Sequence, residues 1–313
     1  VTYTRARDDD SVHAGDTVTV HNGSIHVKRC EEGMGANTMR IKGGALQVKA
    51  GDAGINAAGD LGNPLLTIDG GTIYVDADGD GVDSNQDIVM NDGTLIVMGP
   101  ESGGNGALDY DGSFAMNGGT LVAVGSSDMA MAPSTSSTQP SLMIRTDSTQ
   151  PAETILYVQD EDGEIILGVS SVKAWQNVVI STGTLKKGST YDIYVGGSAS
   201  SVKNGVFTNA KSGTLLASMT LNDVVSTYGN AGMMPGQEGG GRGGREVGGC
   251  GKPVGGEPAV ECESRAGRHG GLQGLVPMRN HLARDRRAAG ALERHRVLDP
   301  LPLRVQRHGP GDR

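Results

Sequence analysis

Five segments in the N-terminal half of the chain alternate apolar and polar residues on both sides of a glycine. They read TVTVHNGSIHV, TMRIKGGALQV, LLTIDGGTIYV, DIVMNDGTLIV and SFAMNGGTLVA. Alternation over about four to eight residues is typical of a strand with one buried face. Each segment therefore predicts two short strands joined at a glycine bend. The glycines recur at intervals of 21–27 residues and are Gly23, Gly44, Gly71, Gly93 and Gly119.

A third strand in each repeat is predicted by another set of apolar residues with the same period. These residues are Val12, Met34, Ile55, Val82 and Leu108. The repeat is too short for a propeller blade and lacks the helical segment of most leucine-rich repeats. It fits one coil of a right-handed parallel β-helix, in which coils stack about 4.8 Å apart. We therefore predict an all-β fold, with a solenoid of about five coils over residues 1–140.

The period is lost near Pro140, and the organisation of the chain changes there. Segments such as ETILYVQDEDGEIILGV and STYDIYVGG still have a strand–turn–strand pattern. We predict a β-rich capping module over 141–228, because the open end of a solenoid invites pairing with other chains. Residues 229–245 are typical of a glycine-rich linker. The segment 246–313 is predicted to be a basic low-complexity tail, either disordered or translated out of frame.

The charge of the front of the chain argues against nucleic acid as a partner. Residues 1–241 hold 28 acidic and 13 basic groups, and residues 242–313 hold 8 acidic and 14 basic groups. Phosphate binding needs a cationic surface, which the acidic front does not supply. No stretch approaches the roughly 18 apolar residues that predict a membrane-spanning helix. The three cysteines lack a metal-ligand spacing. We expect a monomer without a membrane span.

Acidic residues recur at one turn of each repeat. They include Asp10, Glu32, Asp52, Asp80 and Asp109. In stacked coils such carboxylates lie close together, and two of them about 4 Å apart repel by about 4 kcal/mol at an effective dielectric constant near 20. Calcium relieves this repulsion because it takes carboxylate, carbonyl and water oxygens in flexible turns. Ordinary turn chemistry is the alternative, since Asp, Asn and Gly favour turns without any metal.

The densest acidic cluster is a loop that begins with D-x-D-x-D-G, as the calcium loop of an EF-hand does. Its carboxylates include Asp76, Asp78, Asp80 and Asp83. Asp83 occupies a position that is normally apolar in an EF-hand, and strand patterns rather than helices flank the loop. We therefore predict a calcium-type loop without an EF-hand, in which Asp80 is the residue most worth mutating.

Lysines form a second column in the predicted stack. Lys28, Lys49 and Asp76 each follow the second strand of successive repeats. Lys49 is therefore predicted to lie about one strand spacing from Asp76. A lysine beside calcium-binding carboxylates could abstract the proton α to a uronate carboxylate, which is the layout of a pectate-lyase site. A surface ion pair is the plainer interpretation of the same two residues.

Four longer motifs resemble the family of carbohydrate-binding domain-containing proteins. They are GDAGINAAGD at 51–60, GGTIYVDADGDGVDSN at 70–85, GGNGALDYDGSFAMNGGTLVAVGSSDMAMAPSTSSTQ at 103–139 and VVISTGTLKKGSTYDIYVGG at 178–197. The resemblance covers roughly residues 8–228, and Ala53 stands where the family has an acid. It implies a secreted, calcium-bearing right-handed parallel β-helix similar to family 9 polysaccharide lyases. It also implies binding to plant cell-wall polysaccharides such as cellulose and polygalacturonate.

We therefore expect an extracellular or cell-surface protein that binds polysaccharide without catalysis. An acidic protein needs a bridge to an acidic glycan, and calcium can bind the carboxylates of both. One alternative is a calcium-dependent polysaccharide lyase that uses Lys49 as its base. The other is a structural or adhesive surface solenoid without a glycan preference.

Overall fold

The structure is a computed structural model that describes residues 2–3 and 10–229. The predicted tail over 246–313, and all but the first residue of the predicted linker over 229–245, lie outside these residues. The regular elements of the described residues are all strands, so the predicted all-β class is confirmed. The described residues contain no helix long and apolar enough to cross a membrane.

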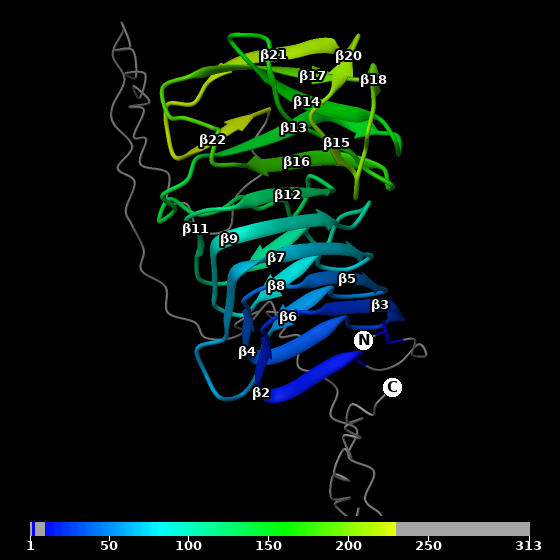
Figure 1. Ribbon diagram of the computed structural model, residues 1–313, viewed down its shortest axis with the longest axis vertical. Helices are drawn as coiled ribbons and strands as arrows, with labels where there is room; N and C mark the ends of the chain where they lie inside the picture. Colours follow the sequence, from blue (N-terminus) through cyan, green and yellow to red (C-terminus); the bar gives the residue numbers. More distant parts are fainter. Residues whose placement is uncertain (1, 4–9, 230–313) are drawn as a thin grey trace, which may run out of the picture. The chain divides into compact units, whose positions relative to one another are not determined.

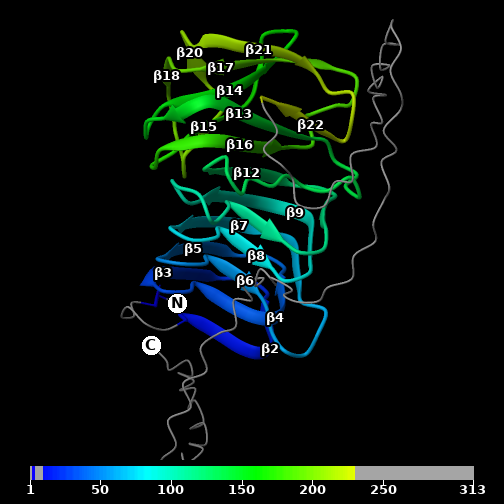
Figure 2. The ribbon, with the colours of Figure 1, turned by 180° about the vertical axis from the view of Figure 1, so that it is seen from behind.

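Fifteen strands of the described residues form one large sheet, which Figures 1 and 2 show from opposite sides. These strands are β1 (Thr2–Tyr3), β2 (Val12–Val20), β3 (Ser24–Cys30), β4 (Met34–Ile41), β5 (Ala45–Ala50), β6 (Ile55–Ala57), β7 (Leu65–Ala77), β8 (Val82–Ser84), β9 (Asp87–Met98), β10 (Leu108–Tyr110), β11 (Phe114–Met116), β12 (Thr120–Gly125), β13 (Ser141–Gln150), β16 (Trp175–Ser181) and β22 (Val225–Tyr228).

The other strands of the described residues form a five-stranded antiparallel sheet and a two-stranded one. The five-stranded sheet contains β14 (Ile155–Asp160), β15 (Ile165–Ser170), β17 (Thr190–Val195), β19 (Val206–Phe207) and β21 (Thr214–Thr220). The pair is β18 (Ser198–Ala199) with β20 (Ala210–Lys211). The segment 141–228 thus supplies strands to every sheet, and the domain boundaries expected at its two ends stay predictions.

The strands of the N-terminal half pair in the register that the sequence predicts. Met34 lies opposite Val12 on one side and Ile55 on the other. Val82 lies opposite Ile55 and Leu108 in the same way. Met34, Ile55 and Val82 are fully buried in the core that the large sheet encloses. The predicted stacking of these five residues is therefore confirmed.

The architecture predicted from this stacking, a right-handed parallel β-helix solenoid, is wrong. β12 pairs in parallel with β9 but antiparallel with β16, and β16 is also antiparallel to β13. The large sheet is therefore a mixed half-barrel that continues into strands from the predicted capping module (Figure 1).

The physical reason for this difference is that β12 is buried on both faces. Leu121 and Ala123 face the core that the large sheet encloses, whereas Val122 and Val124 face a second core. Leu156 of β14 lies in that second core, so the two sheets pack face to face as in a β-sandwich. Alternation predicts one buried face, but the run LVAV has no alternation and marks a strand that is buried on both.

The glycines at the predicted bends have a conformation that other residues rarely adopt. Gly71 has a φ of 92°, and the other four bend glycines have φ between 90° and 101°. A Cβ atom added at Gly71 would lie 2.9 Å from the carbonyl oxygen of Gly44 in the adjacent turn. The bends therefore require glycine for their backbone angle, and all of them except the bend at Gly23 also require it for the close approach of neighbouring turns.

Candidate functional site

A group of carboxylates, here called the acidic row, follows the turns and short strands at one side of the large sheet. Asp10, Glu32 and Asp80 lie in one column of this group, and Asp83 and Asp109 lie in a second column beside it. Backbone N–H groups of Ser11, Gly33 and Gly54 donate to the carbonyls of Glu32, Ala53 and Asp80, respectively. Asp10, Glu32, Ala53 and Asp80 therefore follow one another from turn to turn. The predicted column is present, and Ala53 takes the place of an acid at one of its turns.

A second column runs beside the first, three residues further along the chain. Asn56 of β6 lies opposite Asp83 of β8, and Asp83 lies opposite Asp109 of β10. The inward neighbour Val82 anchors β8 in the core, so the half-buried Asp83 belongs to the outward face of its strand. The fold thus gathers Asp80, Asp83 and Asp109 in one region of the surface.

Burial and neighbouring carboxylates raise the pKa of three members of the acidic row, Glu32, Asp83 and Asp109. Burial, followed by the charges of Asp109 and Asp80, raises the pKa of Asp83 to about 7. Burial, followed by the charges of Asp10 and Asp52, raises the pKa of Glu32. Burial and a nearby carboxylate also raise the pKa of Asp109. These raised pKa values mean that the three carboxylates bind a proton, or another cation, more readily than isolated carboxylates do.

The oxygen atoms of this region suit a hard cation. Asn56 Oδ1 is buried and has no hydrogen-bond partner among the described residues. Asp80 Oδ1 accepts a hydrogen bond of 2.7 Å from the backbone N–H of Gly106, which fixes one side of that carboxylate. In the present side-chain positions, no three His, Cys, Asp or Glu residues of the described ranges are gathered to hold one metal ion. A calcium ion there would need the carboxylates to turn toward a shared point, with the Asn56 oxygen as a further donor.

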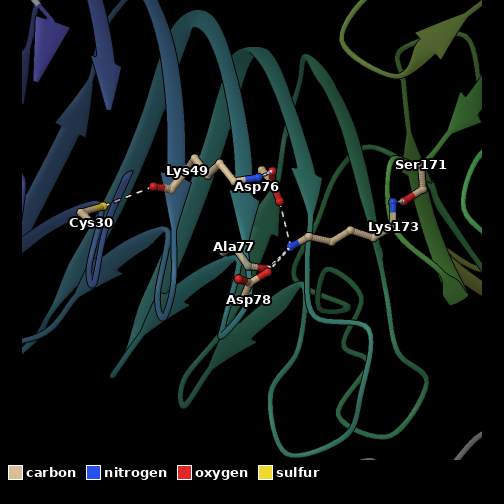
Figure 3. Close-up of polar contacts among 7 residues, drawn as sticks. All are labelled: Cys30, Lys49, Asp76, Ala77, Asp78, Ser171 and Lys173. Atoms are coloured by element: carbon tan, nitrogen blue, oxygen red, sulfur yellow. Dashed lines mark hydrogen bonds and ion pairs between the residues drawn. The ribbon is translucent and has the colours of Figure 1, made fainter. Parts of the chain in front are cut away.

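Two carboxylates of the predicted calcium loop lie in a different environment, in which each pairs with at least one lysine (Figure 3). Asp76 Oδ2 is 2.6 Å from Lys49 Nζ, and its Oδ1 is 2.8 Å from Lys173 Nζ. Lys173 Nζ is also 2.8 Å from Asp78 Oδ1 and donates to the carbonyl of Ala77. The predicted set of ligands therefore divides in two, with Asp76 and Asp78 already paired with ammonium groups.

The ion pairs fix the protonation state of Asp76. Burial acts to raise the pKa of Asp76, but the hydrogen bonds from Lys173 and Lys49 outweigh it and hold the pKa below its usual range. The side chains of Asp76 and Lys173 are only 10% and 13% exposed, whereas that of Lys49 is 62% exposed. Lys173 is therefore the more buried partner of this carboxylate.

Lys49 lies where the sequence places it, since it is opposite Asp76 in the pairing of β5 with β7. Its hydrogen bond to Asp76 raises the pKa of Lys49. A general base must give up its proton near neutral pH, which requires a lowered lysine pKa. This arrangement therefore favours an ion pair over a base at Lys49.

Asp52 lies against backbone rather than in the acidic row. A Cβ atom at Gly79 would be 2.3 Å from Asp52 Oδ1, so the carboxylate occupies the space that the glycine leaves open. Its charge still contributes to the raised pKa of Glu32.

Sequence reasoning missed a chain of hydrogen bonds along the glycine bends, here called the amide ladder. It consists of Asp69, Asn91, Asn117 and Thr138. Asn91 Nδ2 donates to Asp69 Oδ1 at 2.9 Å, Asn117 Nδ2 donates to Asn91 Oδ1 at 3.1 Å, and Thr138 Oγ1 donates to Asn117 Oδ1 at 3.3 Å. In the sequence, an Asp or Asn follows each of the buried residues Ile68, Met90 and Met116. Turn propensity alone explains an Asp or Asn at these positions, so the sequence did not indicate a chain of hydrogen bonds.

Sequence reasoning also missed Lys173, which precedes β16. It lies 95 residues from Asp78 in the chain. Because the two residues belong to different repeating patterns, no period in the sequence relates them. The adjacent Ala174 N–H donates to Glu101 Oε1 at 2.7 Å, so this segment is held at two points.

The fold and these sites define an all-β protein whose polar chemistry lies along the outward faces and bends of stacked strands. The sequence model of one family, described as carbohydrate-binding domain-containing protein, matches residues 3–214. The chain belongs to this family. No curated protein and no solved structure matches the chain. The implied similarity to family 9 polysaccharide lyases is not supported, because the large sheet is mixed rather than a parallel β-helix.

Proposed function

We propose that this protein binds polysaccharide outside the cell or at the cell surface. Its proposed ligands are plant cell-wall glycans of the cellulose or polygalacturonate type. The observation that carries the proposal is membership of the carbohydrate-binding family over residues 3–214. The polar groups along stacked strands support it, because a polymer needs repeated contacts over a long surface.

We further propose that the acidic row holds calcium. Asp80, Asp83 and Asp109 would supply carboxylate oxygens, and Asn56 would supply an amide oxygen. The raised pKa of Asp83, about 7, and the unpartnered Asn56 oxygen support this choice of residues. When bound, calcium supplies positive charge that attracts glycan carboxylates to an otherwise acidic surface.

Binding without catalysis is preferred over the lyase alternative. The lyase reading needs Lys49 as a neutral amine, but its hydrogen bond to Asp76 favours the ammonium form. Lys49 and Asp76 then act as an ion pair between an exposed ammonium group and a largely buried carboxylate.

The proposed function is tested by retention of the protein on polysaccharides with calcium or with a chelator. We expect sedimentation with insoluble cellulose or retardation in gels that contain polygalacturonate. Retardation by polygalacturonate should be lost in chelator, because calcium is the proposed bridge. Absence of retention on both polymers, with or without calcium, would contradict the proposal. Growth of unsaturated-uronate absorbance during incubation with polygalacturonate would instead support the lyase alternative.

A further inference from the structure

The amide ladder crosses four neighbouring segments of the molecule. Asp69 belongs to β7 and Asn91 to β9, and these strands pair in parallel. Asn117 follows β11, which pairs in parallel with β9, and Thr138 precedes β13. Successive positions of the ladder on these strands are therefore one strand spacing apart, about 4.8 Å.

The hydrogen bonds of the ladder all run in one direction. Thr138 donates to Asn117, Asn117 donates to Asn91, and Asn91 donates to Asp69. Asp69 ends the chain as a carboxylate, and Arg40 of β4 holds it from the other side with two nitrogens at 2.7 and 2.6 Å. The hydrogen bond from Asn91, followed by the contacts of Arg40, lowers the pKa of Asp69. An aligned chain that ends on a charge is strengthened by mutual polarisation.

This alignment fixes the amide planes but leaves part of each amide for another partner. An amide nitrogen carries two N–H donors, and Asn91 and Asn117 each use one of them within the described residues. The side chains of Asn91, Asn117 and Thr138 are exposed. The side chain of Arg40 is 52% exposed. The ladder therefore presents preorganised donors at a regular spacing, which lowers the entropy cost of binding.

We propose that the amide ladder is a binding rail for a linear polysaccharide, which lies along the stacking direction of the strands. The strand spacing is close to the length of one pyranose residue, so successive sugars lie beside successive residues of the ladder. Sugar hydroxyls accept from the spare amide N–H groups and donate to the remaining lone pairs of Asp69. The rail is separate from the acidic row and from the Lys49–Asp76–Lys173 cluster. This inference rests on the proposed polysaccharide-binding function.

The test compares wild-type protein with the double variant Asn91→Ala/Asn117→Ala on the polysaccharide that retains the wild type. Removing one hydrogen-bonding amide is expected to weaken retention about threefold to tenfold, and the double variant should lose more than tenfold. Gln47→Ala is the matched control, because it removes an exposed amide from β5, outside the ladder. The control should bind as the wild type does. Calcium affinity, measured with calcium alone, should be unchanged in the double variant.

Equal retention of the wild type and the double variant would overturn the rail while leaving the proposed function intact. Absence of wild-type retention on every polymer would overturn the proposed function and the rail together. If the double variant does not fold, the single variants Asn91→Ala and Asn117→Ala replace it. Each single variant removes one amide of the ladder. Unchanged affinity of both variants for the polysaccharide would also overturn the proposal.

Discussion

Asp76 shows most clearly how one residue acquires a role that its local sequence does not predict. The loop motif predicts a calcium ligand, but the carboxylate lies between the ammonium groups of Lys49 and Lys173. The Lys49 contact was predictable, because the repeat places these residues opposite each other. The Lys173 contact was not, because it joins segments with different sequence patterns. Charge on the motif alone therefore overestimates the number of carboxylates available to a metal.

The ion pairs of Asp76 predict how the stability of the protein depends on pH. The pKa of Asp76 is lowered from 3.8 in the folded protein. The stabilisation is therefore fully present above about pH 3.8 and is lost as the pH falls through the lowered pKa. Near neutral pH, Asp76→Asn should have a lower free energy of unfolding than the wild type, and this difference should shrink toward about pH 2.5.

Denaturant titrations over this pH range measure the difference. Asp162→Asn is the control, because Asp162 is exposed in the turn between β14 and β15. Its free energy of unfolding should stay within about 0.5 kcal/mol of that of the wild type, as is usual for exposed positions. A difference between Asp76→Asn and the wild type that stays constant down to about pH 2.5 would contradict the assigned ion pairs.

Among the elements, the strands of the large sheet were predicted more completely than their packing. Strict alternation in segments such as TMRIKGGALQV indicated both the strands and their buried side. The runs LIVM in β9 and LVAV in β12 did not indicate a buried side, because each face of these strands meets a different core. Sequence periodicity describes one strand at a time, whereas a β-sandwich requires knowledge of which strands from elsewhere cover the second face.

Ile96 of β9 tests whether the second face of the large sheet is a core. It is 2% exposed and shares an outward column with Tyr74 of β7 and Gln47 of β5. Ile96→Ala should lower the free energy of unfolding by about 2–5 kcal/mol, as core truncations do. Gln47→Ala in the same column should change it by less than about 0.5 kcal/mol. Similar small effects of both substitutions, measured by denaturant unfolding, would contradict the sandwich packing.

At the scale of the whole molecule, the sequence predicted the family and one of the two surfaces that we propose for binding, but not the other. The acidic row was predictable because its carboxylates recur with the repeat. The amide ladder was not, because Asp and Asn at bends are common without any ligand. The structure separates three outward features, namely the acidic row, the lysine-paired Asp76 cluster and the amide ladder. We propose that the acidic row holds the calcium that attracts glycan carboxylates, and that the amide ladder hydrogen-bonds the sugar hydroxyls.

The most direct test of this account is a calorimetric titration of polygalacturonate oligomers into the wild type and Asp80→Asn at saturating calcium. Binding by the wild type should disappear in chelator. The affinity of Asp80→Asn should be at least about tenfold weaker, which corresponds to a loss of about 1.4 kcal/mol. Asparagine can still accept the hydrogen bond from Gly106, so the variant tests charge more than folding. Equal affinity of both proteins, unchanged by chelator, would contradict a calcium-mediated mode of polysaccharide binding.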